Sequence, residues 1–230
     1  MLENIRESVF RANLDLVKHG LVIHSWGNVS GRDPETGYIV IKPSGVTYEK
    51  LRADDMVVVD LSGKIIEGRL NPSTDTPTHL LLYRKWPEIG GIVHTHSTCA
   101  TAWAQAGRNI PPLGTTHADT FYGEIPCTRK LKSFEVKSDY EINTGRVIVE
   151  RLGPINPLHM PSVLVFGHGP FSWGTTPEEA VYNAVTLEEV ARMALYTILL
   201  GRNKPVEKHL LDKHFLRKHG KKAYYGQSKN

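Results

Sequence analysis

The sequence predicts one α/β domain of the layered kind, with a sheet that contains antiparallel strand pairs. Segments with helical and with strand periodicity alternate along the 230 residues, and such interleaving builds layered α/β domains. Two strand-like runs, residues 56–60 and 64–66, flank the turn Leu61-Ser62-Gly63 as a hairpin, which requires antiparallel pairing. No internal repeat, low-complexity stretch or Pro/Gly/Ser-rich linker divides the chain. We therefore expect a single domain over residues 1–230.

Five helices follow from apolar residues that recur every three to four positions. Gly20 is the expected C-cap of the first helix. Thr176-Pro177-Glu178-Glu179 predicts the start of the longest helix, as a capping box with Pro at the first helical position. The expected helices cover residues 2–18, 76–83, 98–106, 177–200 and about 205–218.

Strand-like segments lie between these helices. Besides the hairpin, residues 37–42, residues 92–96 and a Val-rich run at 163–166 are expected to form strands. The long stretch after residue 106 is expected to mix turns with short strands, and Val147-Ile148-Val149 is one of those strands.

Composition is that of an ordinary soluble globular protein, with 40% hydrophobic and 23% charged residues. No apolar run approaches the length of about eighteen residues that spans a bilayer, and the N-terminal segment has no signal-peptide core. Cys99 and Cys127 are not closely spaced in the way that a disulfide framework would require, which indicates a reducing compartment. We expect both cysteines to be small buried hydrophobic residues rather than nucleophiles. We expect a cytoplasmic protein with no membrane partner.

Positive charge concentrates at the C-terminal end. The last thirty residues hold nine Lys or Arg against two acidic residues, a net charge of +7, whereas the whole chain carries +4. Such a tail can be a solvated helix face, or it can bind nucleic acid, a membrane surface or an anionic small molecule. No recognition motif accompanies the charge, so we expect no nucleic-acid partner. The solvated face and a tail that covers a phosphorylated substrate, in a neighbouring subunit, both stay open.

The segment with the most chemical content is His94-Thr95-His96, at the end of an apolar run. Two histidines at positions i and i+2 of a strand point to the same face. His168, between two glycines after the second Val-rich run, adds a third imidazole at a strand end. Three imidazoles with an open position suit a catalytic divalent metal, most often zinc. The first two could also be ordinary buried or surface residues, and His168 favours the metal.

Three turns carry polar groups that suit an anion. In residues 26–32, two glycines flank an amide and a hydroxyl side chain. Residues 42–45 place an ammonium and a hydroxyl group at a strand end, and residues 71–75 place two hydroxyl groups directly before a helix. Hydroxyls and free N–H groups at a helix N-terminus form a ready phosphate site. Each turn could also be a turn and nothing more, because Gly, Ser and Asn are common turn residues. Asp75 could be a helix cap, a neighbour of the metal or a base.

Five motifs occur in order along the chain: Trp26-Gly27-Asn28-Val29-Ser30, Lys42-Pro43-Ser44-Gly45, residues 73–79, residues 91–97 and Gly167-His168-Gly169-Pro170. In this combination the sequence resembles the class II aldolase/epimerase superfamily. Residues 114–119, 125–129 and the tail at 211–227 resemble more closely the branch of that superfamily formed by the L-ribulose-5-phosphate 4-epimerases. The resemblance runs nearly end to end.

The resemblance implies a three-layer fold with a central, mainly antiparallel sheet that has helices on both faces. It also implies one Zn²⁺ or other divalent ion per subunit, and a homotetramer with active sites at subunit interfaces. Residues from about 205 to 230 would contribute to a neighbouring subunit's site. The implied metal ligands are His94, His96 and His168, with Asp75 as a fourth or alternating ligand. The implied substrate contacts are Gly27, Asn28, Lys42, Ser44, Gly45, Ser73, Thr74, Thr115 and His214. Asp119 and Tyr225 would be the acid/base pair, with Tyr225 reaching in from the adjacent subunit.

The reaction that the resemblance implies is the interconversion of L-ribulose 5-phosphate and D-xylulose 5-phosphate in pentose catabolism, such as arabinose breakdown. C4 is not next to the carbonyl, so its inversion calls for cleavage and re-formation of the C3–C4 bond by a metal and two proton carriers.

Three alternatives stay open. A class II ketose 1-phosphate aldolase would need the same zinc but a stronger base than Asp75, where aldolase relatives carry Glu. A zinc hydrolase would be expected to have Asp-His after the H-x-H motif, and this chain has Ser97-Thr98. A zinc-binding module without activity would leave the motifs around Asp119 and Tyr225 without a role.

Overall fold

The computed structural model describes residues 2–226, and one seven-stranded sheet lies at their centre. Neighbouring strands follow the order β4-β3-β2-β1-β5-β7-β6, and every neighbouring pair is antiparallel. The predicted hairpin of residues 56–66 is confirmed as the pair β3 and β4. The strands are β1 (Asn28–Arg32), β2 (Ile39–Ile41), β3 (Val57–Val59), β4 (Ile65–Glu67), β5 (Gly91–His94), β6 (Ser162–Leu164) and β7 (Pro170–Gly174).

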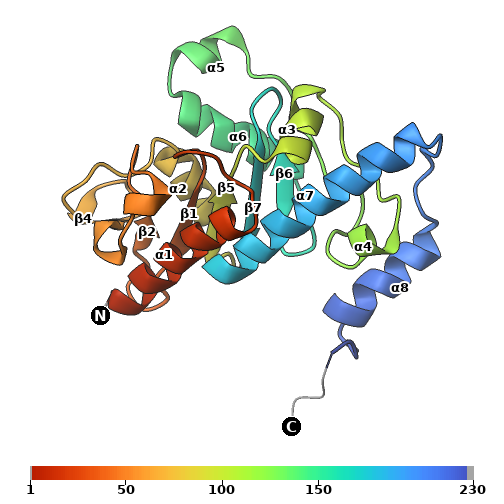
Figure 1. The fold of residues 1–230 in the computed structure, drawn as a ribbon, viewed down its shortest axis with the longest axis horizontal. Helices are drawn as coiled ribbons and strands as arrows, with labels where there is room; N and C mark the ends of the chain where they lie inside the picture. Colours follow the sequence, from red (N-terminus) through yellow and green to blue (C-terminus); the bar gives the residue numbers. More distant parts are fainter. Residues whose placement is uncertain (1, 227–230) are drawn as a thin grey trace.

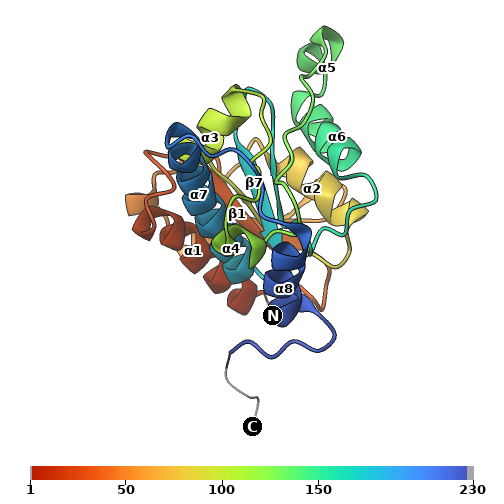
Figure 2. The same ribbon diagram turned by 90° about the vertical axis from the view of Figure 1, so that its right-hand side faces the viewer.

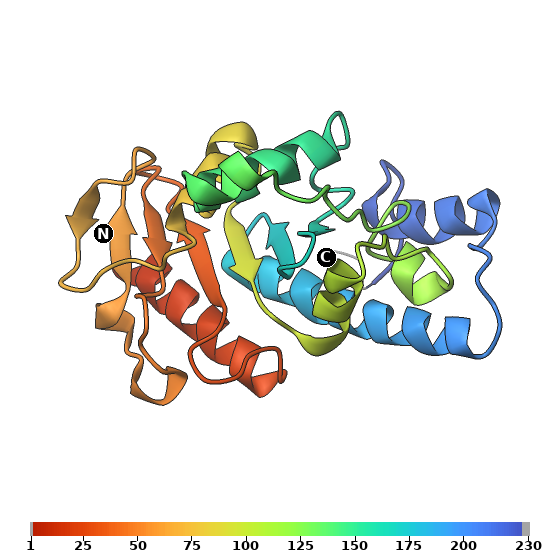
Figure 3. The ribbon, with the colours of Figure 1, turned by 90° about the horizontal axis from the view of Figure 1, so that it is seen from above.

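Helices lie on both faces of the sheet, which confirms the predicted three-layer α/β fold of a single domain (Figure 1). Helices α1 and α7 cover one face, whereas α2 and α6 cover the other, as the end-on view shows most clearly (Figure 2). Seen from above, α7 runs beneath the sheet toward the end of the molecule where α4 and α8 lie (Figure 3). The α-helices are α1 (Glu3–Lys18), α2 (Thr76–Lys85), α3 (Thr98–Gln105), α4 (Thr115–Ala118), α5 (Ser133–Lys137), α6 (Tyr140–Leu152), α7 (Pro177–Leu199) and α8 (Lys208–His219).

Strand β5, next to the central strand β1, contributes neighbouring residues to two different core clusters. Ile92 packs in the cluster that contains Leu80 and Tyr83 of α2. Val93 belongs to a separate cluster with Leu16 of α1 and residues of α7. Because side chains alternate along a strand, His94 has the orientation of Ile92 and faces the α2 layer. The strand thus delivers a histidine to the layer in which Asp75 precedes α2.

The predicted strand at Val147-Ile148-Val149 is wrong, because these residues lie inside α6. Their β-branched side chains favour a strand locally. Thr144, Val147, Ile148 and Leu152, however, are buried at helical spacing, and α6 packs against α2. The short helices α4 and α5 were also not predicted within this stretch.

Capping follows the predicted chemistry with one change. Gly20 has a φ of +67° directly after the last turn of α1, a conformation that glycine adopts without strain. At the start of α7, Thr176 Oγ1 accepts the Glu179 N–H at 3.2 Å, as a capping box requires. The Glu179 carboxylate, however, accepts from the backbone N–H of Thr175, one residue earlier than predicted. In residues 2–226 no helix is long and apolar enough to cross a membrane.

Candidate active site

Three histidines from two neighbouring segments meet at one edge of the sheet. His94 is the last residue of β5, His96 follows two residues later, and His168 lies in the turn between β6 and β7. β5 and β7 are hydrogen-bonded neighbours, which brings this turn beside the end of β5. Ligand nitrogens of the three imidazoles all lie within 4.8 Å of one another. The triad forms although the strand ends at His94, before the second histidine.

His94 is held with one nitrogen turned toward the other two histidines. Its Nδ1 lies 2.9 Å from the carbonyl oxygen of Pro170, so Nδ1 must carry the proton and donate it. Its ring stacks on Phe171, with centroids 4.2 Å apart and planes at 17°. The Nε2 atom is therefore an acceptor fixed in direction, which is how a backbone carbonyl orients an imidazole that binds metal.

The spacing of the triad fits a metal ion. The Nε2 atoms of His94 and His96 are 3.2 Å apart. Two nitrogens bound to one tetrahedral zinc ion at 2.0–2.1 Å are separated by about 3.3 Å. Burial, together with the adjacent His94 and His96, lowers the pKa of His168 to about 3, and burial likewise lowers the pKa of His96. Both shifts favour the neutral imidazole of His96 and His168, which is the form that binds a metal.

Asp75 is the residue directly before α2. In the described part of the chain its side chain makes no capping hydrogen bond to that helix. Its Oδ2 instead accepts a hydrogen bond of 2.8 Å from the Asn28 amide. Burial tends to raise the pKa of Asp75, but His94, His79 and the Asn28 amide outweigh it, and the net pKa is lowered. Asp75 faces the cavity that contains the histidines, although the tight group of ligand atoms found among the described residues consists of the triad without it.

The triad lies in a cavity of about 560 Å³ whose wall includes eleven of the predicted site residues. Three neighbouring strands supply part of this wall, because the start of β1 and the ends of β2 and β5 lie at the same end of the sheet. The segment before α2 and the turn between β6 and β7 supply further residues. The eleven are Gly27, Asn28, Lys42, Ser44, Gly45, Ser73, Thr74, Asp75, His94, His96 and His168.

Lys42 brings a cation to this wall from an apolar environment. Its side chain is almost fully buried, and burial lowers its pKa to about 8. The Nζ atom donates to the Val46 carbonyl at 2.7 Å and lies 4.9 Å from the centre of the Tyr48 ring. Lys42 therefore both closes the turn that carries Ser44 and Gly45 and places a positive charge behind it.

The amide of Asn28 has its donors engaged. Nδ2 donates to Ser73 Oγ at 3.1 Å and to Asp75 Oδ2 at 2.8 Å. The Oδ1 atom is buried without a partner among residues 2–226. Because an ionised carboxylate only accepts, Asp75 fixes which way the amide points. The atom that remains is an acceptor, and a phosphate group needs donors.

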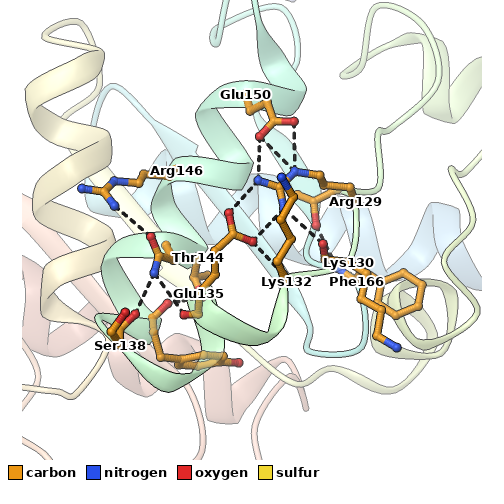
Figure 4. Close-up of polar contacts among 12 residues, drawn as sticks. Arg129, Lys130, Lys132, Glu135, Ser138, Thr144, Arg146, Glu150 and Phe166 are labelled. Carbon is orange, nitrogen blue, oxygen red and sulfur yellow. Dashed lines mark hydrogen bonds and ion pairs between the residues drawn. The ribbon is translucent and has the colours of Figure 1, made fainter.

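Tyr140 and Glu141, at the start of α6, also line this wall and were not predicted. Arg129 fixes the segment that carries them (Figure 4). Its guanidinium donates twice to Glu135 of α5, at 2.8 Å each, and also to Glu150 of α6. The Tyr140 hydroxyl reaches to 3.5 Å from His168 Nδ1. The pair escaped sequence analysis because this stretch was expected to hold strands and turns.

Four predicted site residues lie elsewhere in the described part of the chain. Thr115 opens α4 and Asp119 ends it, whereas His214 lies on α8 and Tyr225 follows that helix. Helices α4 and α8 pack together at the end of the molecule opposite α5 (Figures 1 and 2). The Asp119 carboxylate contacts His214 Nδ1 at 2.9 Å, Arg217 Nη2 at 2.9 Å and Lys218 Nζ at 3.5 Å. It borders a second cavity of about 330 Å³.

Two further histidines are buried and neutral, which makes the stability of the metal-free protein depend on pH. Burial lowers the pKa of His79 to about 3 and that of His117 to about 4. An unfolded histidine titrates near 6.5, so below that pH the unfolded chain binds more protons than the folded chain. We expect the free energy of unfolding of the metal-stripped protein to fall as the pH drops below 6.5, with a slope that approaches about 1.4 kcal/mol per pH unit for each of His79, His117 and the equally shifted His168.

Urea unfolding at several pH values measures this slope. His117→Gln is the matched variant, because its amide can still donate to the Gly123 carbonyl, which accepts from His117 Nε2 at 2.7 Å. It should lower the slope by about 1.4 kcal/mol per pH unit. An unchanged slope in this variant would show that His117 is not neutral in the folded state.

Comparison with known proteins identifies the family. A family model described as the class II aldolase and adducin N-terminal domain matches residues 7–195. The chain belongs to the class II aldolase family. Two relatives in this family, both called L-ribulose-5-phosphate 4-epimerase UlaF, are each 58% identical to the chain over 98% of its length and 100% of theirs. They come from Salmonella paratyphi B (strain ATCC BAA-1250 / SPB7) and Salmonella typhi.

The class II aldolase fold is also found by structural comparison. An L-fuculose 1-phosphate aldolase superposes with a TM-score of 0.78 over 92% of this chain and 94% of its own. A second one, from Glaciozyma antarctica PI12, gives 0.79 over 96% of this chain and 84% of its own. The sequence identities of 21% and 20% limit this likeness to the fold. Class II aldolase enzymes are metal-dependent, in agreement with the histidine triad.

Proposed function

We propose that the chain is an L-ribulose-5-phosphate 4-epimerase, which interconverts L-ribulose 5-phosphate and D-xylulose 5-phosphate. The observation that carries the proposal is the 58% identity to proteins of that name over nearly the whole of both chains. The site agrees with it, because a cavity of about 560 Å³ holds a metal-binding triad at one wall and a buried cation at another. Such a cavity suits a small sugar phosphate.

Zn²⁺ is the metal that we propose for the triad, because three neutral imidazoles with an open fourth position are typical of catalytic zinc. When bound there, zinc would polarise the ketose oxygens and stabilise negative charge on the three-carbon fragment as the C3–C4 bond breaks. The chain itself orients His94 through the Pro170 carbonyl and keeps His168 neutral by burial. Asp75 is proposed as a fourth or alternating ligand from the same cavity.

The phosphate end of the substrate is proposed to lie against the turns of Ser44-Gly45 and Ser73-Thr74. Hydroxyls and the positive charge of Lys42 gather there. Gly27 lets its turn lie close against the end of β5, because a Cβ at this position would lie 2.8 Å from the His94 carbonyl oxygen. Holding the phosphate keeps the two-carbon fragment, glycolaldehyde phosphate, in the cavity while its carbonyl turns over before re-addition.

Asn28 is proposed to orient the site rather than to hold the phosphate. Its donors are engaged by Ser73 and Asp75, and its Oδ1 atom is a buried acceptor, so the amide has no donor left for a phosphate group. The same amide fixes the orientation of Asp75. This modifies the expectation that Asn28 holds the phosphate.

Asp119 and Tyr225 are proposed as the acid/base pair, and both would come from a neighbouring copy of the chain. Asp119 borders the second cavity, Tyr225 is exposed, and both contact Arg217 of α8. Neither is among the described residues that line the cavity with the triad. Met193, Tyr196 and Leu199 on α7 expose apolar surface that a second copy could cover, in agreement with the proposed homotetramer. Thr115 and His214, on the same side, would approach the substrate in the same way.

A cellular compartment and a pathway are also proposed for the chain. The free thiols of Cys99 and Cys127 support a reducing, cytoplasmic location. The pathway that the epimerase serves is proposed to be pentose breakdown, as in the use of arabinose.

A coupled assay from L-ribulose 5-phosphate to D-xylulose 5-phosphate tests the function. We expect turnover that a chelator abolishes and that added Zn²⁺ restores, with less than about 1% of the glycolaldehyde phosphate released to solution. Stoichiometric release of that fragment would identify an aldolase instead. Turnover that survives complete removal of metal would contradict the role of the triad.

A further inference from the structure

We propose that Arg217 is a positioning residue that holds Asp119 and Tyr225 together as one unit, so that both reach a neighbouring cavity in a fixed geometry. The inference rests on the proposed epimerase function, because it presumes that these two residues carry protons. It adds a residue that no feature of the sequence singled out.

Arg217 binds the carboxylate of Asp119. Arg217 Nη2 donates to both carboxylate oxygens, at 2.9 Å to Oδ1 and 3.0 Å to Oδ2. His214 Nδ1 adds a bond of 2.9 Å to Oδ1 from the same face of α8. Burial tends to raise the pKa of Asp119, but the bonds from His214 and Arg217 outweigh it and lower the pKa. Arg217 therefore keeps Asp119 ionised and fixes the orientation of its carboxylate.

Arg217 also contacts Tyr225. The guanidinium carbon of Arg217 lies 5.1 Å from the centre of the Tyr225 ring. The backbone carbonyl of the same arginine accepts the N–H groups of Tyr224 at 3.0 Å and Tyr225 at 3.1 Å. The chain thus folds back onto α8 at Arg217 after the helix has ended at His219. Lys218 Nζ also lies near both groups, 4.4 Å from the centre of the Tyr225 ring and 3.5 Å from Asp119 Oδ2. Arg217 differs from it because it adds two bonds to the Asp119 carboxylate and accepts from the backbone of Tyr225.

The helix that carries Arg217, α8, is anchored by a buried aromatic side chain. Phe215 of α8 is almost fully buried, and its ring stacks on that of His219 at 4.5 Å and lies 4.7 Å from that of Tyr122. This anchor lies two residues before Arg217. A planar guanidinium can also donate to both oxygens of a carboxylate while it lies against an aromatic ring, whereas the Lys218 ammonium has a single, longer ion pair with Asp119 at 3.5 Å.

Arg217→Met is expected to lower kcat by about 10- to 100-fold, because displacements of about 1 Å in a reacting group have effects of that size. KM and zinc content should stay within about twofold of the parent values, since the triad and the turns of the cavity are untouched. Arg217→Lys keeps the charge without the planar fork, and its kcat should stay at least about fivefold low. Lys208→Met is the control, because it removes an ion pair with Asp212 on the same helix.

Two comparisons make the test specific. In an Asp119→Asn/Tyr225→Phe background, Arg217→Met should change kcat by less than about twofold, because its targets are already lost. Hydrogen exchange of residues 220–226 should be faster in Arg217→Met by about tenfold, and this readout does not depend on activity. Unchanged exchange, a kcat within twofold of the parent, or an undiminished loss in the double-variant background would each overturn the proposal.

Failure of the proposed function would look different. The parent enzyme would then lack epimerase turnover, while the exchange measurement would still decide whether Arg217 orders the segment that follows α8.

Discussion

Replacing His96 by alanine is expected to remove the bound metal and to lower kcat by about 1000-fold or more, because the chemistry depends on a charged Lewis acid. The Nε2 atom of His96 lies 3.2 Å from that of His94, and no other protein nitrogen of the described residues joins the tight triad. Two imidazoles bind zinc far more weakly than three. His96 follows the strand and is exposed to the cavity, so its loss should leave the fold intact.

Metal analysis of the purified protein and the coupled epimerase assay measure this effect. His209→Ala is the matched control, because His209 is an exposed histidine on α8 whose partner is Glu207. The control should keep full metal content and rate. A His96→Ala protein that retains stoichiometric zinc would contradict the assignment of the triad.

Asp119→Asn is expected to lower kcat by about 10²- to 10⁴-fold, the range over which a positioned acid or base contributes to proton transfer. The substitution keeps the shape of the side chain and removes its ability to take a proton. Because Asp119 directly follows α4 and lies away from the triad, zinc content should stay at the parent level. The combination of lost turnover and retained metal is what separates a proton carrier from a ligand.

Asp212→Asn provides the comparison for this substitution. Asp212 also pairs with a cation on α8, Lys208 at 2.8 Å, and it accepts from Tyr122 at 2.7 Å. It contacts neither Tyr225 nor the triad among the described contacts, and its variant should keep at least about half of the parent rate. Equal losses in the two variants would mean that Asp119 acts by attaching α8 rather than by carrying a proton.

The metal centre was predictable because its residues are close along two chain segments that pair in the sheet. His94 and His96 are two residues apart, and antiparallel pairing of β5 with β7 brings the turn of His168 beside them. The turns at residues 42–45 and 71–75 were predictable as turns for a similar reason, since strong turn residues mark strand ends. Helices with clear caps, such as α1 and α7, also agree with the structure within a few residues.

Tyr140 and Glu141 show where local patterns fail. The β-branched residues of α6 predict a strand, and only packing against α2 selects the helix that carries these two residues to the cavity. That packing is a tertiary effect, and local propensity does not report it.

The position of Asp119 relative to Tyr225 could not be predicted either. The two residues are 106 positions apart, and they meet through Arg217 after Phe215 has anchored α8. The resemblance implied that Tyr225 comes from a neighbouring subunit. The structure adds that Asp119 lies on the same side as Tyr225 and away from the triad.

The most direct test of this composite site is to mix two inactive variants, His96→Ala and Asp119→Asn, by refolding or co-expression so that hybrid assemblies form. We take each site to combine the metal ligands of one chain with the acid/base pair of a neighbour. When equal amounts of the two variants assemble at random, about a quarter of the sites have an intact triad and an intact acid/base pair. We therefore predict recovery of about 25% of the parent rate, in proportion to the hybrids formed. Hybrids of confirmed composition that remain as inactive as either variant alone would contradict the account.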